Sequence, residues 1–311
     1  MTSRLIDISP DGYEPHPIHA DERTWTETNC YLDLWVEVLH SLGLDPVPAA
    51  ACAFGARFDG SQWTFLKFKP EDLFALYGID VGEMNVWRGV LDHVEDNLAV
   101  GMLSTVEVDA HWLPDTAGTG YRESHTKTTI VANFVDRESG VLEYFHNSGY
   151  HRLTGDDFRG LFGLDLAGSA TFTPYVEQVR FDGEPEYRPG RFDAVLRHHL
   201  ATRPDGNPVR ALGERVVADV PGSAARASTR FTCGRSGCCG SAVPPRNSLR
   251  RLRVPRAQRV RGGRGVRSGL PGGGAGAKSV QFQMARAARG RSVDPSAQLD
   301  GMAEAWERSV D

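Results

Sequence analysis

A block of 55 residues limits what this chain can fold into. Residues 222–276 contain 12 Arg but no Lys, Asp or Glu, and they are rich in Gly, Ser and Pro. Such a composition offers little apolar surface for burial, so the block cannot supply a hydrophobic core. A folded core must therefore come from the residues before the block, and we expect residues 277–311 after it to form C-terminal helices.

Three interpretations of this basic block compete. It is a disordered arginine-glycine segment that binds RNA, a solvated linker, or GC-rich coding sequence read out of frame. We favour the frame disruption, because the composition changes abruptly on both sides, and we therefore expect no nucleic-acid partner. Its cysteines, Cys233, Cys238 and Cys239, lack the paired spacing of zinc ligands, so we expect no metal and no cofactor.

The composition of the whole chain is that of a water-soluble protein with one large domain or two. Of its 311 residues 40% are hydrophobic and 24% charged, and the net charge is −5. The N-terminus lacks the apolar core of a signal peptide, and no apolar run is long enough to span a bilayer. Five cysteines without a pattern argue against a disulfide framework. We expect a cytoplasmic protein that does not contact membranes.

Helical patterns come first along the chain and strand patterns follow. Capping residues and apolar spacing predict helices over residues 30–42, 70–77 and 82–100, and a strand edge at 65–68. Strands are predicted at 103–108, 128–135 and 141–145, with a turn at 136–140 and a further helix from 154. This order is typical of an α+β fold, with a core over residues 1–175 and a helical extension over 176–221.

Cys30 stands where the polar run of residues 26–29 meets the first predicted helix. If Thr28 or Asn29 caps that helix, the thiol lies over unpaired backbone N–H groups and the positive end of the helix dipole. Those surroundings favour the thiolate, the reactive form of cysteine, which makes Cys30 the candidate nucleophile. The alternative is that Cys30 is a small, buried and inert apolar residue.

His125 and Asn147 flank the predicted hairpin of residues 128–145. In cysteine catalysis an imidazole takes the thiol proton, and a third polar side chain holds the imidazole in the useful tautomer. Cys30, His125 and Asn147 therefore form the predicted catalytic set, in the chain order of papain-like enzymes. Asn133 or Asp136 is the alternative orienting group.

His146 is the alternative base, since it precedes Asn147 directly. An oxyanion formed during reaction at Cys30 would be stabilised by the backbone N–H of Cys30 together with the side-chain amide of Asn29, or by the hydroxyl of Thr26. The histidines elsewhere in the chain are predicted to lie at the surface or on helix faces: His16, His19, His40, His93, His198 and His199.

The loop of residues 109–124 joins two predicted strands and is rich in polar and aromatic groups. Such loops on a rigid scaffold often bind ligands, so Asp109, Trp112, Asp115 and Tyr121 are predicted to contact substrate, with either aspartate holding an ammonium group. The alternative is a solvated loop with glycines at 118 and 120.

Six short segments of the chain form a distinctive set. They are TETNCYLDLW at residues 26–35, QWTF at 62–65, YGID at 77–80, EVD at 107–109, LPDTAGT at 113–119 and YFHNSGY at 144–150. In these segments the chain resembles a bacterial family of uncharacterised function, domain of unknown function 1839. The resemblance covers about residues 1–220 and resumes after the basic block. It implies a genomic context of amino acid:[carrier protein] ligases and small carrier proteins.

The order of Cys30, His125 and Asn147 is also similar to that in the papain-like acyltransferase domain of butirosin biosynthesis. That resemblance implies a papain-like cysteine protease/acyltransferase fold, with an N-terminal helix packed on an antiparallel sheet. It further implies transfer of an acyl or aminoacyl group from an acyl or amino-acid carrier protein, through acyl-Cys30, to an unknown acceptor. The alternatives are a cysteine hydrolase, either peptidase or amidase, and a non-catalytic binding protein.

Overall fold

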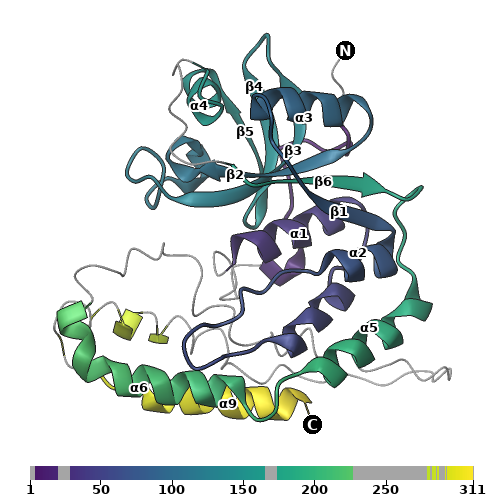
Figure 1. Cartoon of the computed structure of the whole chain (residues 1–311). Helices are drawn as coiled ribbons and strands as arrows, with labels where there is room; N and C mark the ends of the chain where they lie inside the picture. The colour runs from purple at the N-terminus through teal and green to yellow at the C-terminus, as the bar shows by residue number, and fades with distance from the viewer. Residues whose placement is uncertain are drawn as a thin grey trace. The chain divides into compact units, whose positions relative to one another are not determined.

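The structure is a computed structural model that describes residues 4–19, 29–164, 174–226, 279–280, 282–284, 286, 291 and 293–310 (Figure 1). The chain divides into two compact units. The first contains residues 1–22, 26–49 and 67–191, and the second contains 23–25, 50–66 and 192–311. Residues 227–276 of the basic block, with its three cysteines, lie outside the described residues.

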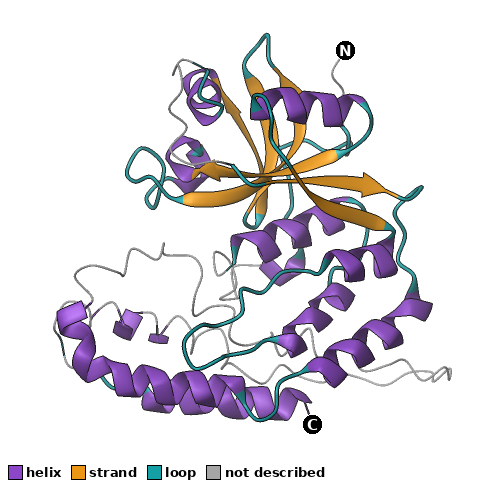
Figure 2. Ribbon diagram, viewed as in Figure 1, coloured by secondary structure: helices purple, strands orange, loops and turns teal. Residues whose placement is uncertain are grey.

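A six-stranded antiparallel sheet forms the centre of the first unit (Figure 2). Its strand order is β1-β6-β2-β3-β4-β5, so the chain enters at one edge and its last strand inserts beside the first. The predicted α+β class is therefore confirmed. The strands are β1 (Ile79–Met84), β2 (Leu103–Asp109), β3 (Lys127–Asp136), β4 (Val141–His146), β5 (Gly149–Thr154) and β6 (Val176–Phe181).

Helices cover both faces of this sheet. Helix α1 (Cys30–Ser41) packs against β3, β4 and β5, while α3 (Val90–Ala99) and α4 (Gly155–Leu161) lie on the opposite face (Figure 1). Because both faces are covered, β3 reads as a nearly continuous buried run instead of alternating with polar residues. The core beneath α3 and α4 includes Val94, Ile130, Tyr144 and Phe158.

Local signals set the ends of the helices in the first unit. The Asn29 side chain accepts a hydrogen bond of 3.1 Å from the backbone N–H of Leu32, as the predicted cap requires. Helix α2 (Pro70–Tyr77) begins with proline and ends at Gly78, whose φ of +71° is left-handed. Short 3-10 turns accompany these helices: η1 (Pro17–His19), η2 (Val47–Gly55), η3 (Ala110–Trp112) and η4 (Pro114–Thr116).

The described residues of the second unit after residue 192 are mainly helical, whereas its segment of residues 50–66 holds an isolated β-bridge between Phe58 and Trp63. Helix α5 (Pro189–Thr202) leads into α6 (Pro208–Arg226), and α6 packs along α9 (Ser296–Val310). The Asn207 side chain donates a hydrogen bond of 2.8 Å to the Ala303 carbonyl, and Arg210 pairs with Glu307 at 2.9 Å. Helix α9 lies within residues 277–311, where the sequence predicted helices.

Two sequence predictions placed helix where the structure has strand. The helix expected over residues 82–100 begins only at Val90, because residues 79–84 pair with β6. The helical extension expected from residue 176 begins only at Pro189, because Val176–Phe181 inserts between β1 and β2. The strand predicted at residues 65–68 does not form. For residues 79–84 and 176–181, pairing with a distant segment decided the conformation, and local spacing does not report such pairing.

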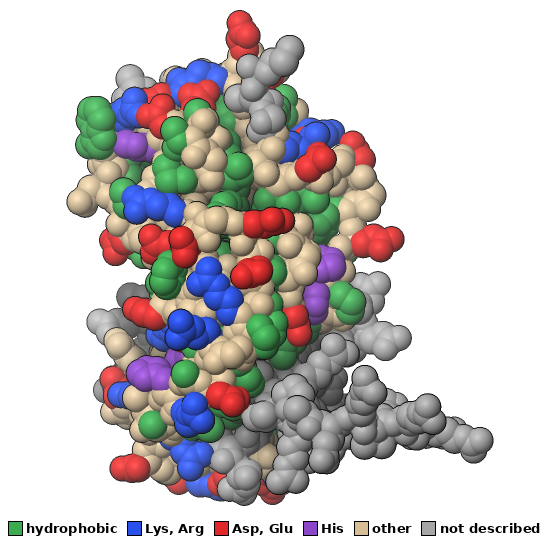
Figure 3. All heavy atoms as spheres, turned by 90° about the vertical axis from the view of Figure 1, so that its right-hand side faces the viewer, with side chains coloured by type: hydrophobic (Ala, Val, Ile, Leu, Met, Phe, Trp, Pro, Cys, Tyr) green, Lys and Arg blue, Asp and Glu red, His purple; other side chains and the backbone are tan. Residues whose placement is uncertain are grey.

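The surface in Figure 3 carries acidic and basic side chains interspersed over the face that it shows. Among the described residues, none of the helices has both the length and the apolar character needed to cross a bilayer.

Candidate functional site

Cys30 is the first residue of α1, and its sulfur lies against strand β3. The sulfur interacts with the hydroxyl of Thr128 and with the backbone N–H groups of Thr129 and Tyr31. Cys30 is partly exposed, whereas the other free cysteine of the described residues, Cys52, is buried. The position at a helix N-terminus was predicted correctly, and the sulfur is not enclosed in an apolar interior.

The protonation state of Cys30 differs from the prediction. Burial raises the pKa of the Cys30 thiol, and this effect outweighs the opposing hydrogen bonds from Thr128, Thr129 and Tyr31. The expected thiolate is therefore wrong for the resting protein, because loss of hydration exceeds what the helix N-terminus supplies. A nucleophilic role for this sulfur requires a group that removes its proton.

A chain of hydrogen bonds leads from Cys30 to a buried imidazole. The Thr128 hydroxyl that contacts the sulfur also lies 2.8 Å from Nε2 of His146. On the other side of the ring, Nδ1 of His146 lies 2.5 Å from Oδ2 of Asp115. His146 and Thr128 are both buried. Cys30, Thr128, His146 and Asp115 are thus connected in series, and we call them the relay.

Asp115 holds the far end of the relay in one orientation. Its second oxygen, Oδ1, accepts a hydrogen bond of 2.5 Å from the Tyr144 hydroxyl. Burial opposes ionisation of this carboxyl, but the hydrogen bond and charge of His146, with His151 and Tyr144, outweigh it and lower the pKa of Asp115. An ionised Asp115 on Nδ1 favours the tautomer with a proton on Nδ1, which leaves Nε2 free to accept a proton from Thr128.

His125, the predicted base, has a different set of contacts. Its Nδ1 lies 2.6 Å from Oδ2 of Asp109, and its ring stacks on His111 with the centroids 4.5 Å apart. The side chain is 60% exposed. Among the described residues, the sulfur of Cys30 contacts Thr128 and Thr129 of strand β3 and the backbone of Tyr31, and not His125. The structure therefore connects Cys30 with the alternative base, His146.

Asn147, the predicted orienting group, occupies the turn between β4 and β5. Its φ of +47° lies in the left-handed region, which Asn tolerates better than most residues. The two other candidates are held elsewhere as well. Asn133 exchanges hydrogen bonds with the backbone of Ile6 at 2.8 and 2.9 Å, and Asp136 caps the following turn at Glu138 and Ser139. Asp115 takes the orienting position in the structure.

The loop of residues 109–124 is ordered by its own contacts. Asp109 accepts hydrogen bonds from the backbone of His111 and Thr126, besides its contact with His125. Trp112 lies under the guanidinium of Arg122, 4.4 Å from the ring centroid. Four of the residues predicted to bind substrate thus have partners within the protein. Asn29 accepts a hydrogen bond from Leu32, Asp109 contacts His125, Trp112 packs under Arg122, and the Tyr121 hydroxyl donates a hydrogen bond of 3.0 Å to Asp157. Thr26 lies outside the described residues.

A second polar cluster lies along α1, and sequence reasoning placed its histidine at the surface. His19 is buried and contacts Glu37 through Nδ1 and Asp33 through Nε2, the latter at 3.3 Å. Burial lowers the pKa of His19, but the hydrogen bonds and charges of the two carboxylates reverse this and raise it to about 9. The Tyr13 hydroxyl donates a further hydrogen bond of 2.6 Å to Glu37. Asp33 and Glu37 are one helical turn apart, a spacing that could have suggested a shared cation.

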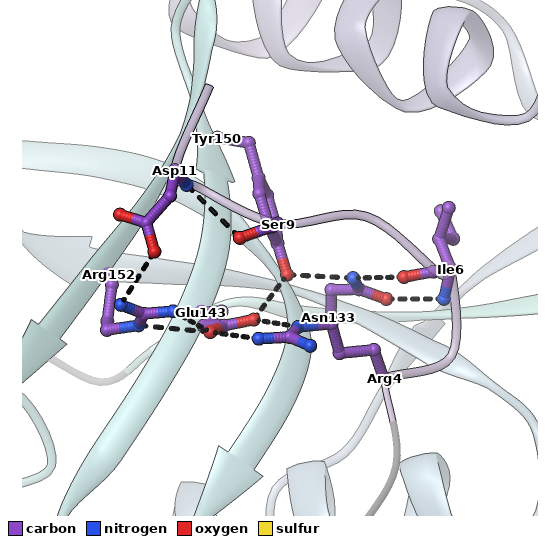
Figure 4. A network of polar contacts seen from close by, with 8 residues as sticks. All are labelled: Arg4, Ile6, Ser9, Asp11, Asn133, Glu143, Tyr150 and Arg152. Atoms are coloured by element: carbon purple, nitrogen blue, oxygen red, sulfur yellow. Dashed lines mark hydrogen bonds and ion pairs between the residues drawn. The ribbon is translucent and has the colours of Figure 1, made fainter. Parts of the chain in front are cut away.

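The N-terminal segment is attached to the sheet by a third polar network (Figure 4). Glu143 on β4 is buried and binds Arg4 at 2.5 and 2.9 Å and Arg152 at 2.9 and 3.0 Å. Burial opposes its charge, but these arginines and Tyr150 outweigh that effect and lower the pKa of Glu143. This network positions the strand that ends at His146. The same view includes Ile6, Ser9, Asp11 and Asn133.

Among the described residues, no group of three or more His, Cys, Asp or Glu side chains is arranged to hold a metal ion. The sequence model of the DUF1839 N-terminal domain matches residues 14–181. The chain belongs to the DUF1839 family. The match to the DUF1839 domain includes all four residues of the relay. A search of curated proteins found none that matches the chain.

Proposed function

We propose that this DUF1839 protein transfers an acyl or aminoacyl group from a carrier-protein thioester, through acyl-Cys30, to an acceptor. The observation that carries the proposal is the relay, in which a partly exposed thiol is connected through Thr128 to a histidine oriented by Asp115. A thiol joined to an imidazole that a carboxylate orients is the arrangement used in nucleophilic cysteine catalysis. The thioester donor and the carrier protein come from the resemblance described above.

In the proposed reaction the Cys30 proton moves to Thr128 while the Thr128 hydroxyl proton moves to Nε2 of His146. The sulfur attacks the thioester carbonyl carbon, a new C–S bond forms, and the original C–S bond breaks. The departing thiolate takes a proton back through the same path. An amine acceptor then attacks acyl-Cys30, so that a C–N bond forms and the C–S bond to Cys30 breaks. The proton that the amine loses to His146 passes through Thr128 to the released sulfur and restores the thiol. The N–H groups of Tyr31 and Thr129 stabilise the sulfur whenever it carries negative charge.

We also propose that the first unit is a variant of the papain-like fold. The support is a helix with cysteine at its first position, packed on an antiparallel sheet that carries the histidine. The variation concerns the imidazole, which lies at the end of β4 and reaches the sulfur through a hydroxyl. In the standard arrangement the imidazole contacts the thiol directly.

The proposal is tested by trapping the acyl-enzyme. The full chain is incubated with an acyl-pantetheine thioester, quenched in acid and analysed by peptide mass spectrometry. We expect the acyl mass on the peptide that contains Cys30 and its absence in Cys30→Ala. The matched control is Cys52→Ala, which removes the buried cysteine and should leave acylation unchanged. Acylation that persists at another residue in Cys30→Ala would refute the proposal.

The hydrolase alternative uses the same relay with water as the acceptor. Acyl-Cys30 formed as above is divided into aliquots with and without a primary amine. A transferase gives the amide and releases acid slowly when no amine is present, whereas a hydrolase releases acid at the same rate in both. A non-catalytic binding protein would form no acyl-Cys30, and Cys30→Ala would bind the carrier protein as tightly as the parent does.

A further inference from the structure

A caged lysine lies against Tyr31, the residue that follows Cys30 in α1. The Nζ atom of Lys67 is 4.5 Å from the ring centroid of Tyr31 and 5.1 Å from that of Tyr175. It also lies 3.8 Å from Oε1 of Glu177, a buried carboxylate. Two aromatic faces and one carboxylate thus fix the position of this ammonium group.

The carboxylate of the cage accepts hydrogen bonds from three other side chains. Glu177 accepts hydrogen bonds of 2.6 Å from Tyr31, 2.8 Å from Thr105 and 3.1 Å from Tyr175. At 3.8 Å, Lys67 attracts Glu177 by charge but donates no hydrogen bond to it. Among the described residues, the three N–H donors of Lys67 meet no acceptor at hydrogen-bonding distance. The side chain is 35% exposed, so these donors are open to a ligand.

Residues that are neighbours in α1 and in the sheet connect the cage with Cys30. Tyr31, one wall of the cage, follows Cys30 directly in α1. On the sheet, Thr129 donates its N–H to the Cys30 sulfur and lies opposite Glu107 in the register of β2 and β3. The backbone N–H of Glu107 donates 2.9 Å to the carbonyl of Tyr175, the other aromatic wall. The cage and the sulfur therefore border the same part of the sheet.

We propose that Lys67 binds an anionic oxygen of the substrate that reacts at Cys30. The shared chemistry is a carboxylate or a phosphate whose oxygens accept the open N–H donors of a lysine fixed in place. Two sources fit: the carboxylate of an amino-acid acceptor, or the phosphate of a phosphopantetheinyl donor. This inference deepens the proposed function and rests on it for the identity of the substrate. The presence of an anion site beside the sulfur can be tested without any acyl transfer.

The test compares an anionic with a neutral alkylating agent at Cys30. The wild-type chain is treated with iodoacetate or iodoacetamide, and the modification of the Cys30 peptide is followed by mass spectrometry. We expect the ratio of the two rates, iodoacetate over iodoacetamide, to fall about fivefold in Lys67→Met, because the variant loses a nearby positive charge. Lys67→Arg should keep the ratio. The matched control is Lys69→Met, an exposed lysine two residues away, which should not change it.

Protection experiments then distinguish the two sources. Alanine and alaninamide, or phosphopantetheine and pantetheine, are added as protectants while iodoacetamide reacts with Cys30. Protection by alanine but not alaninamide identifies an acceptor carboxylate, and protection by phosphopantetheine but not pantetheine identifies a donor phosphate. Either preference should be absent in Lys67→Met.

The inference is overturned if the wild-type chain and Lys67→Met give the same rate ratio, or if native Cys30 reacts with neither reagent. Both results concern anion binding alone. The proposed acyl transfer fails by a different result, the absence of acyl-Cys30 from the trapping experiment.

Discussion

The substitution His19→Gln removes the cation that lies between two buried carboxylates of α1. In the wild-type protein His19 contacts Asp33 and Glu37, and all three side chains are almost wholly excluded from solvent. Glutamine keeps hydrogen-bonding groups but carries no charge. The variant leaves the two carboxylates without a buried counter-ion, a change that costs about 3–5 kcal/mol of unfolding free energy.

The pH dependence of stability separates loss of charge from loss of packing. The pKa of His19 is raised to about 9 in the folded protein from an ordinary value of 6.5. Since the folded-state value is the higher one, the stabilisation is fully present below pH 6.5 and is lost as the pH rises through 9. The difference between the two values corresponds to about 3 kcal/mol. The wild-type protein should lose about that much stability over this range, and His19→Gln should not.

Urea unfolding followed by circular dichroism at several pH values between 6 and 10 measures both effects. The control is His198→Gln, an exposed histidine whose replacement should leave the midpoint unchanged at every pH. The reasoning is refuted if His19→Gln unfolds at the wild-type urea concentration near pH 6.5. It is also refuted if the two proteins show parallel loss of stability up to pH 10.

Three further predictions concern other parts of the first unit. Glu143→Gln should lower the free energy of unfolding by about 2 kcal/mol, because two arginines lose a buried anionic partner, and urea unfolding at pH 7 checks this. Gly160→Ala should lower the melting temperature, since a Cβ atom there would lie 2.3 Å from the Trp112 ring. The clash costs about 1–3 kcal/mol, which is more than the stabilisation that the higher helix propensity of alanine provides. An unchanged melting temperature would contradict this prediction. Alkylation of Cys30 should show a pH midpoint above that of a free cysteine peptide, because burial raises the pKa of the Cys30 thiol. A midpoint below that of the peptide would contradict this and support the thiolate predicted from the sequence.

Sequence reasoning was successful where structure is decided locally. The cap at Asn29 and the stop at Gly78 are read from residue types within a few positions, and both helices form as predicted. Strands β2, β3 and β4 also form close to their predicted ends. Local spacing could not place β1 and β6, since their pairing joins residues about a hundred positions apart.

The candidate site was predicted only in part for a related reason. The position of Cys30 follows from a local cap, and His146 was recognised as an alternative base. Thr128 had no signal, because a threonine in a β-branched run is read as an ordinary strand residue. The preference for His125 followed from chain order alone. Which histidine connects to Cys30 depends instead on how α1 packs over strands β3 and β4. Burial of His19 likewise depends on tertiary packing around α1.

The most direct test of the account is the rate at which Cys30 is acylated when the hydroxyl of residue 128 is removed. Thr128→Val keeps the shape of the side chain but breaks the path between the sulfur and His146, whereas Thr128→Ser keeps the hydroxyl. Measured by quenched-flow mass spectrometry with an acyl-pantetheine thioester, Thr128→Val should acylate about 100-fold more slowly than the wild-type chain, and Thr128→Ser within a few-fold of it. Wild-type rates in Thr128→Val would show that the proton of Cys30 leaves by another path and would contradict the account.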